Sequence, residues 1–466
     1  PLEHYYSTGC SQEVFHRIYQ SYDSWMRQKH LIDFDDMLVY CYELLSQRKD
    51  ILTGWQERFQ YILIDEFQDI NKLQFDIVKL LAKPQDNLFV VGDDDQSIYR
   101  FRGAKPEIML GFEAVYPEAK KVLLDVNYRS QSQIVEGAKR LIAHNEKRFE
   151  KNIHASRPAE QAIETQRFPD QFAQNQHTIK KLLSYREQGQ SYENMAILFR
   201  TNAQPRLLME QLMSYNIPFR TRDSIPNLYD HWIAQDILTY LRLALGSRAR
   251  ADFLKVMNRP KRYITRESLE EGTVAFDVWA DYFYEKKQPW VAERIEQLEA
   301  DLRVLSRISP FAAINYIRSG IGYEGYLTEY ADYRRIKAEE LLEVLDELQD
   351  SARAYKTYEE WFAHIEDYTK ELKQLQERQA GERECVSLAT LHSAKGLEYP
   401  IVFILDVNEG VMPYKKAVLS AELEEERRMF YVGVTRARDR LHLYYSDRIN
   451  GREMEPSRFL GEMKST

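Results

Sequence analysis

Short apolar segments alternate with helical stretches in the first third of the chain, and this alternation constrains the fold more than any other feature. Segments 61–64, 88–91 and 122–124 are rich in β-branched, aromatic or Leu residues, and each ends at an acidic or glycine residue. We interpret each of them as a buried strand. Helical patterns separate them, as in 72–83 and 133–144. Strands that alternate with helices predict a parallel sheet and therefore an α/β fold.

The same strand pattern resumes at 195–199 and returns at 386–390, 401–405 and 441–445. The interruption, from about residue 217 to about residue 383, shows apolar residues at helical spacing among Glu and Arg, without a comparable strand pattern. The simplest organisation is one α/β lobe followed by a second one, with a mainly helical domain inserted in the second lobe.

Composition narrows the class of protein. A length of 466 residues suggests about three domains. The net charge of −9 excludes a uniformly basic nucleic-acid binder but leaves room for a local basic channel. The longest apolar runs are too short to span a membrane, and the N-terminus does not resemble a signal peptide. The 3 cysteines are widely spaced and odd in number, which favours a reducing, cytoplasmic setting.

Asp65 and Glu66 follow directly after the first predicted strand. In parallel sheets, ligands bind beyond the carboxyl ends of the strands. An Asp at such a place can hold Mg²⁺, and a neighbouring Glu can polarise a water. The pair alone could equally be a solvated start of a helix, where acidic side chains interact favourably with the helix dipole.

The segment 92–104 combines three consecutive aspartates with a glutamine, two aromatic residues and two arginines. A Gln at a strand end can contact a γ-phosphate. Aromatic side chains near arginines can stack on bases and hold a nucleic-acid backbone. The alternative is that Tyr99 and Phe101 simply belong to a hydrophobic core.

Five segments together carry a specific signal: Ile64–Asp69, Gly92–Ala104, Asn127–Ser130, Thr390–Glu398 and Glu425–Ala437. In this order they resemble the helicase motifs of the UvrD/Rep/PcrA family of superfamily 1 DNA helicases. The order makes the resemblance specific, more than any single motif does.

The resemblance implies two RecA-like parallel-sheet lobes, the first one incomplete, and an ATP-dependent enzyme that moves 3′ to 5′ on single-stranded DNA and unwinds duplex. It implies these parts: 1–30 as a remnant of helical subdomain 1B, 31–122 as the second half of domain 1A, 123–216 as the first part of domain 2A, 217–383 as the helical inserted domain 2B, and 384–466 as the second part of domain 2A.

It also implies a pocket for ATP and Mg²⁺. Asp65 would bind Mg²⁺, and Glu66 would orient the hydrolytic water. Gln96 would contact the γ-phosphate and couple it to DNA. Tyr128 would stack on adenine, and Glu398 would hydrogen-bond the ribose.

A cationic clamp and a DNA path follow from the same resemblance. Arg129 and Arg436 would contact the γ-phosphate with their planar guanidinium groups. The expected partners are single-stranded DNA, junctions with duplex, and repair or replication proteins. The residues expected along the DNA, the last three as phosphate contacts, are Tyr99, Phe101, Arg102, Asn202, Arg206, His392, Ser393 and Lys395.

The chain departs from the family in one major respect, because it contains no Gly-x-x-x-x-Gly-Lys-Ser/Thr loop to hold phosphates. Only 64 residues precede Asp65, and the first residue is Pro1. We therefore expect the chain to be a C-terminal portion of a larger helicase that by itself binds ATP weakly and hydrolyses it negligibly.

Two smaller departures concern DNA. Phe101 stands where the family usually has Trp, so we expect modestly weaker stacking. The segment 259–265 matches a turn that contacts duplex DNA in the family, but it lacks the glycine that allows a close backbone approach.

Alternative interpretations remain for the whole chain. The helicase part of a recombination nuclease would need a carboxylate-rich nuclease domain, and nothing after Arg440 resembles one. The other alternative is a non-catalytic DNA- or partner-binding remnant of a helicase. A phosphate-loop motif encoded upstream of Pro1 would favour the helicase, whereas an initiator Met directly before Pro1 would favour the remnant.

Several motif residues also have structural interpretations. Arg427 and Arg428 fit surface partners of the preceding Glu residues at i,i+4 spacing. Asp33 and Asp35, which match a family segment, could be the polar face of a helix. His442 and Tyr444 alternate along a strand, which favours packing.

Overall fold

The computed structural model describes residues 10–158, 162–223, 225–378 and 384–464. The described residues form two compact units. The first, a helical unit, comprises residues 10–16 and 225–378, and the second, an α/β unit, comprises residues 17–223 and 384–464. The helical unit is therefore an insertion in the α/β unit, as the sequence pattern predicts.

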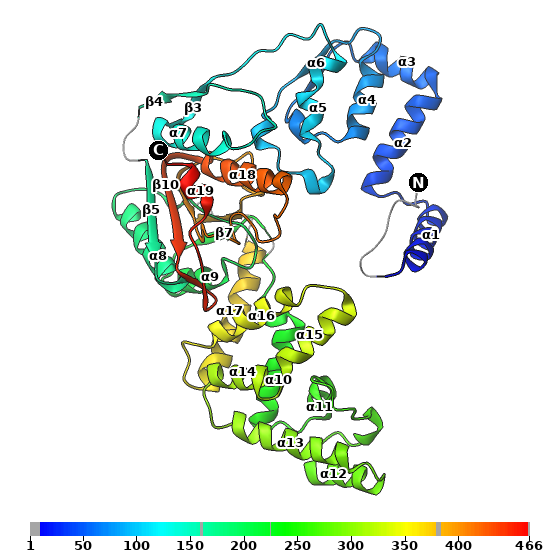
Figure 1. The fold of residues 1–466 in the computed structure, drawn as a ribbon, viewed down its shortest axis with the longest axis vertical. Coiled ribbons are helices and arrows are strands. Elements are labelled where there is room, and N and C mark those ends of the chain that lie inside the picture. The colour runs from blue at the N-terminus through cyan, green and yellow to red at the C-terminus, as the bar shows by residue number, and fades with distance from the viewer. Residues whose placement is uncertain (1–9, 159–161, 224, 379–383, 465–466) are drawn as a thin grey trace. The chain divides into compact units, whose positions relative to one another are not determined.

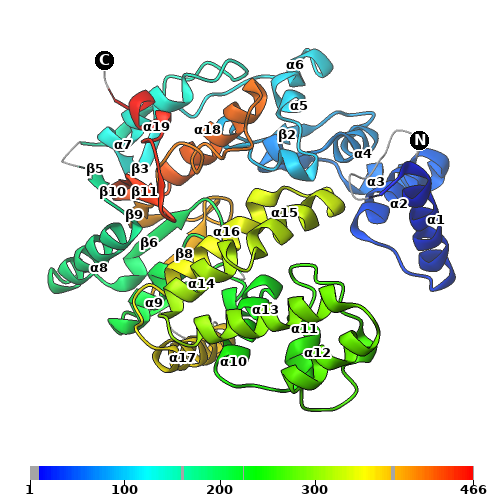
Figure 2. The same ribbon diagram turned by 60° about the horizontal axis from the view of Figure 1, so that its bottom comes forward.

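A six-stranded parallel sheet forms the centre of the α/β unit, with the strand order β5-β10-β9-β6-β8-β7. Every residue of β6 and β8 is buried, because helices cover both faces of the sheet. Figures 1 and 2 show α7 and α18 on one face and α8 and α9 on the other. The six strands are β5 (Ile163–Phe168), β6 (Met195–Phe199), β7 (Phe219–Thr221), β8 (Val386–Thr390), β9 (Tyr399–Ile404) and β10 (Ala437–Ser446).

Helix α18 (Ser420–Val434) approaches this sheet closely through Gly433. A Cβ atom at Gly433 would lie 2.4 Å from Cδ2 of Leu391 and 3.3 Å from Cδ1 of Ile404. The core around it joins apolar residues of α7, α18 and the sheet. The other helices near the sheet are α7 (Ser132–Ile142), α8 (Gln171–Glu187), α9 (Arg206–Ser214) and α19 (Arg458–Glu462).

A smaller parallel sheet pairs β1 (Ile62–Ile64) with β2 (Leu88–Val90). The strands are where the sequence predicts them, but only one of their faces is covered, by a small core around Phe67. Leu63 and Phe89 on the other face are exposed, so the prediction of buried strands is wrong for that face. The helices of this region are α1 (Gln12–Gln28), α2 (Phe34–Gln47), α3 (Lys49–Arg58), α4 (Lys72–Ala82), α5 (Pro106–Leu110) and α6 (Phe112–Val115).

Two further predictions of secondary structure are wrong. Segment 122–124 is not a strand, and its three side chains are exposed; the strand β3 (Val126–Gln131) begins just after it and pairs with β4 (His154–Arg157). The region predicted to lack strands contains β7, which is short and hydrogen-bonds to β8. In both cases, whether the segment forms a strand depends on whether a partner strand lies beside it, and this cannot be read from the local sequence. The remaining pair is β11 (Arg448–Ile449) with β12 (Arg452–Glu453).

The helical unit contains eight described α-helices from residue 225 onward, seen from below in Figure 2. Asp236 is fully buried and accepts hydrogen bonds from Arg259 and Tyr323, both at 2.8 Å, which tie two distant segments together. None of the described helices combines the length and the apolar character needed to cross a bilayer. The helices are α10 (Trp232–Ala244), α11 (Arg250–Val256), α12 (Phe276–Glu285), α13 (Pro289–Leu305), α14 (Pro310–Ser319), α15 (Tyr323–Arg334), α16 (Ala338–Ser351) and α17 (Tyr358–Arg378).

Candidate nucleotide and nucleic-acid site

Asp65 and Glu66 lie directly beyond the carboxyl end of β1, and both are exposed. Glu66 adopts a left-handed backbone conformation, with φ of 51°, which turns the chain sharply after the strand. The buried Gln68 connects the two strand ends: its amide donates to Glu66 Oε2 at 2.5 Å and accepts from the backbone N–H of Asp93 at 2.9 Å. One glutamine thus positions the carboxylate after β1 and the loop after β2.

Gly92 makes room for this glutamine. A Cβ atom at Gly92 would lie 2.4 Å from Oε1 and 3.2 Å from the backbone N of Gln68. We expect Gly92→Ala to displace Gln68 and to destabilise the fold by about 1–3 kcal/mol in urea unfolding. Gly54→Ala is the control, because nothing lies within 4 Å of its added methyl in α3. A Gly92→Ala variant as stable as Gly54→Ala would contradict this account.

Gln96 and Arg436 lie in contact, although 340 positions separate them in the sequence. Nη2 of Arg436 donates to Gln96 Oε1 at 3.2 Å, while Nε2 of Gln96 donates to Asp93 Oδ2 at 2.8 Å. The structure therefore brings the predicted γ-phosphate glutamine of one motif to the predicted arginine of another.

The guanidinium of Arg436 is held in a rigid, buried position, with only 2% of the residue exposed. It donates to the carbonyl oxygens of Val432 at 2.9 Å and Leu397 at 3.0 Å. Burial and the nearby charge of Arg129 lower the pKa of Arg436 to about 10, although Glu66 and Asp93 act in the opposite direction. This arginine remains charged at neutral pH, and its position lies in the field of the carboxylate that follows β1.

Arg129 and Glu398 pair with each other, since Nε of Arg129 lies 2.5 Å from Glu398 Oε2. Both side chains are partly exposed. Tyr128, next in the chain to Arg129, is 76% exposed and leaves its ring accessible. Tyr128, Glu398 and Arg129, which are predicted for adenine, ribose and one of the γ-phosphate contacts, therefore lie at the surface of the α/β unit.

Lys395 occupies a different setting from the one its predicted DNA contact suggests. Its ammonium is ion-paired with Asp69, lies 3.5 Å from Glu66 Oε2 and donates to the backbone oxygen of Gln96 at 2.8 Å. A phosphate contact from Lys395 would have to compete with Asp69. No role was predicted for Asp69, whose position four residues after Asp65 is the only signal for it in the sequence.

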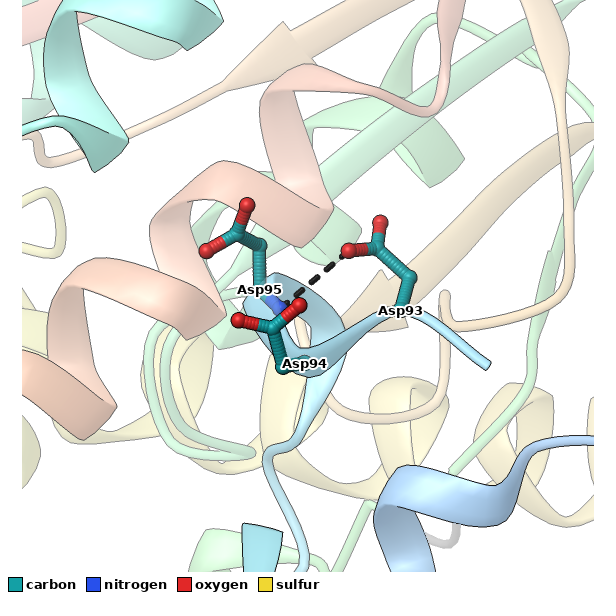
Figure 3. Close-up of side chains that lie close together, drawn as sticks. All are labelled: Asp93, Asp94 and Asp95. Atoms are coloured by element: carbon teal, nitrogen blue, oxygen red, sulfur yellow. Dashed lines mark hydrogen bonds between the residues drawn. The ribbon is translucent and has the colours of Figure 1, made fainter. Parts of the chain in front are cut away.

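The three consecutive aspartates form a cluster, shown in Figure 3, in which carboxylate oxygens lie within 4.8 Å of one another; Asp94 and Asp95 are buried, and Asp93 is half-buried. Lys151 lies among them, at 2.5 Å from Asp93 Oδ1, 2.5 Å from Asp94 Oδ1 and 2.9 Å from Asp95 Oδ2. Arg148 adds a bidentate pair with Asp95 at 2.8 and 2.7 Å. Because a lysine ammonium occupies its centre, this cluster is an ion-pair network that binds the loop after β2 to the segment before β4.

The electrostatics of the cluster follow from this geometry. Burial alone would lower the pKa of Lys151, but the three carboxylates raise it above its ordinary value. Burial also works against ionisation of Asp93, yet Lys151 keeps the pKa of that carboxyl below its usual range. Neither Lys151 nor Arg148 was predicted, because nothing local in the sequence links them to residues more than 50 positions earlier.

The predicted DNA-binding aromatics gather around His392. Phe101 is 66% exposed, and its ring meets that of His392 edge-on at 5.5 Å. The guanidinium of Arg102 lies over both Tyr99, at 5.3 Å, and Phe101, at 5.4 Å. Burial, with Arg200 nearby, lowers the pKa of His392 to about 4, so its ring is neutral at physiological pH. Tyr99 contributes partly to the core, but Phe101 does not.

Of the remaining predicted DNA residues, Ser393 and Asn202 lie in turns and Arg206 begins a helix. Ser393 is anchored by Asp223, which also accepts from the backbone N–H of Thr390 at 2.9 Å. Asn202 lies in the turn after β6, and Arg206 begins α9. Asp223 was not predicted, because it follows a strand that the sequence pattern did not reveal.

The structure confirms some of the structural interpretations given to motif residues and contradicts others. Arg427 and Arg428 are buried rather than on the surface; Arg428 pairs with Glu424 as predicted, but Arg427 binds Glu462 instead of a preceding Glu. Asp33 caps α2 in a reciprocal capping box. His442 and Tyr444 are buried in the sheet, where His442 stacks on Phe403, which confirms packing.

The parallel α/β fold of this chain, with strand-end carboxylates and a glutamine that contacts a buried arginine, is consistent with the class of RecA-like helicase folds. Residues 122–448 match the UvrD-like helicase C-terminal domain, and residues 2–117 match the UvrD/REP helicase N-terminal domain. The chain therefore belongs to the UvrD-like helicase family.

Curated relatives agree with this assignment. The chain is 33% identical to the ATP-dependent DNA helicase PcrA of Staphylococcus epidermidis, over 96% of this chain and 64% of that protein. It is 33% identical to the PcrA of Bacillus subtilis, over 93% and 61%, and 31% identical to the PcrA of Staphylococcus aureus, over 98% and 65%. The chain thus spans between 61% and 65% of the length of these relatives.

Proposed function

We propose that this chain forms part of an ATP-dependent DNA helicase that moves 3′ to 5′ on single-stranded DNA and unwinds duplex. The contact between Gln96 and Arg436 is the observation that carries the proposal. A nucleotide that contacts both side chains would link the segment after β2 to the end of α18, so hydrolysis would remove a link between two parts of the α/β unit.

The donor set at β1 fits a divalent cation that accompanies a nucleotide. Carboxylate oxygens are the ligands that Mg²⁺ prefers, and Asp65 and Glu66 are exposed at the strand end. Asp65 would hold the ion, and Glu66 would orient a water. When bound, Mg²⁺ neutralises charge on the phosphates.

The domain boundaries are also proposals. Strand β7 hydrogen-bonds to β8, which supports assigning residues up to about 223 to the second lobe and starting the inserted domain 2B after them. The segment 259–265 remains the proposed duplex contact. Tyr263 in this segment has φ of 60°, the left-handed conformation that a glycine would adopt without strain.

Binding of single-stranded DNA gives a direct test. We expect Phe101→Ala to weaken binding of a fluorescent oligo(dT) by about 5- to 150-fold, because stacking on one aromatic contributes about 1–3 kcal/mol. Phe101→Trp should bind at least as tightly as wild type. Phe172→Ala removes a similarly exposed ring from α8 and is the control. Equal losses in both alanine variants, measured by anisotropy at fixed salt, would contradict the proposed DNA path.

The rate of ATP hydrolysis is expected to distinguish the whole enzyme from this chain alone. Because the 466 residues contain no phosphate-binding loop of the Gly-Lys-Ser/Thr type, we expect weak MgATP binding and negligible DNA-stimulated hydrolysis by the chain alone. A coupled ATPase assay with and without oligo(dT) measures this. Turnover at rates typical of helicases would refute the expectation. We further propose action in the cytoplasm, on single-stranded DNA and its junctions with duplex, alongside repair or replication proteins.

A further inference from the structure

Asp406 is a buried carboxylate that the nucleotide site and the aromatic surface do not use. It follows β9, and only 3% of the residue is exposed. Within the part of the chain that the structure describes, its side-chain hydrogen bonds all come from glutamine amides: Gln174 at 2.8 Å, Gln204 at 3.0 Å and Gln171 at 3.1 Å. Burial raises the pKa of Asp406, and the three amides lower it only in part.

This arrangement is unfavourable for a residue that serves the core alone. Burying a carboxylate without a cation costs free energy that hydrogen bonds recover only partly. This cost is explained if the carboxylate fixes the position of another group.

Gln204 is the group that the carboxylate fixes. Its Oε1 accepts from the backbone N–H groups of Arg200 and Thr201, both at 2.8 Å, while its Nε2 donates to Asp406. Because Asp406 accepts from Nε2 of Gln204, it holds this amide with its nitrogen toward Asp406 and its oxygen toward the turn. The orientation of this one amide therefore determines the shape of turn 200–204.

That turn carries two of the side chains proposed to contact DNA. Asn202 lies within it, and Arg206 begins α9 directly after it. The other side of the turn is anchored independently, because Arg200 pairs with Glu426 of α18 at 2.7 Å. Asp406 and Glu426 thus hold the turn from two different elements.

We propose that Asp406 is a positioning residue for the single-stranded DNA contacts, acting through Gln204 on turn 200–204 and hence on Asn202 and Arg206. The proposal rests on the proposed function. It predicts that removal of the acceptor at position 406 changes DNA binding through the turn, and not through the general stability of the sheet.

Asp406→Asn tests this with almost no change in volume. Asparagine keeps one acceptor oxygen and replaces the other with an N–H₂ group. A single acceptor atom then remains for the amides of Gln204, Gln174 and Gln171, so the hydrogen bond from Gln204 is weakened or lost. We expect the affinity for oligo(dT) to fall about tenfold, the effect of about one lost hydrogen bond. Gln204→Leu should cause the same loss by a second route. Gln171→Leu removes a donor to Asp406 without touching the turn, and should bind DNA like wild type.

A double-mutant cycle with Arg206→Ala provides the readout that a merely structural role would not change. If Asp406 acts through the turn, the loss of affinity in the double variant is smaller than the sum of the two single losses, because part of the effect of Asp406→Asn passes through Arg206. Additive losses, or wild-type binding by both Asp406→Asn and Gln204→Leu, would overturn the inference while Arg206→Ala still weakens binding. Wild-type binding by Arg206→Ala itself would count against the proposed DNA path and would overturn this inference with it.

Discussion

Replacement of Lys151 by Met is expected to destabilise the α/β unit by about 3–5 kcal/mol at neutral pH, because it leaves buried carboxylates without their central cation. The Lys151 side chain is 7% exposed, and those of Asp94 and Asp95 are 1% exposed, so water cannot replace the lost ammonium without opening the loop. Arg148 pairs with Asp95 and leaves Asp93 and Asp94 to repel each other. Urea unfolding followed by circular dichroism measures the loss.

The same substitution should also change how the free energy of unfolding depends on pH. In the wild type, Lys151 holds the pKa of Asp93 below its unfolded value against the effect of burial, so this contribution to stability is lost as the pH falls. In Lys151→Met, burial without the cation raises the folded-state pKa values, so protonation favours the folded state. The deficit of the variant should therefore shrink between pH 7 and about pH 4.

The control for this experiment is Lys121→Met. Lys121 pairs with Glu113 at 2.9 Å, but both side chains are more than half exposed. Surface pairs contribute about 0–1 kcal/mol, so this variant should unfold almost like the wild type at every pH. A loss in Lys151→Met no larger than in Lys121→Met would mean that the cluster does not hold the loop.

In a longer protein that joins this chain to a phosphate-binding loop, Arg436→Met should remove most of the response to nucleotide while changing stability little. A charge-assisted hydrogen bond contributes about 1.5–3 kcal/mol, so affinity for a fluorescent ATP analogue with Mg²⁺ should fall by about 10- to 150-fold. In the whole enzyme, loss of such an arginine would reduce turnover by about 10³- to 10⁵-fold. Nucleotide titration and thermal shift measure the two effects separately.

Two opposed effects explain why stability should change little. Burial and Arg129 disfavour the charge of Arg436 and lower its pKa to about 10, so removing the charge relieves a cost. The same change leaves the carbonyl oxygens of Val432 and Leu397 without this donor, which costs a similar amount. Arg436→Lys keeps the charge but not the planar geometry, and should also bind nucleotide poorly.

Arg167→Met is the matched control for nucleotide binding. Arg167 lies on β5 and forms an exposed pair with Asp447 at 2.7 Å. The Arg167→Met variant should bind nucleotide like the wild type. An Arg436→Met protein with an unchanged nucleotide-induced thermal shift would remove the main support for the proposed pocket.

Much of the fold was predictable because its signals are local. The strands at 195–199, 386–390 and 401–405 are recognisable as short apolar runs, and the structure contains β6, β8 and β9 there. Segment 122–124 carries the same local signal but has no partner strand, and β7 has a partner but little signal. Pairing between distant segments decides such short runs.

The candidate site divides in the same way. Asp65, Glu66, Gln96 and Arg436 could be selected from sequence because each lies in a recognisable motif beside a predicted strand or helix. Lys151, Asp223 and Asp406 could not, because their importance comes from the groups they contact. The predicted exposure of two motif residues was also wrong, because Arg427 and Arg428 are buried ion-pair partners and not surface charges.

The amino-acid sequence alone determined the parallel α/β class, the helical insertion and the family, because hydrophobic periodicity and motif order can be read directly from the sequence. The tertiary structure decided which charges meet. It placed Arg436 against Gln96, Lys151 among three aspartates and Gln204 on Asp406. The physical reason is that the energies of buried charges and hydrogen bonds depend on distances across the fold. For residues that are far apart in the sequence, these distances cannot be inferred from the residues themselves.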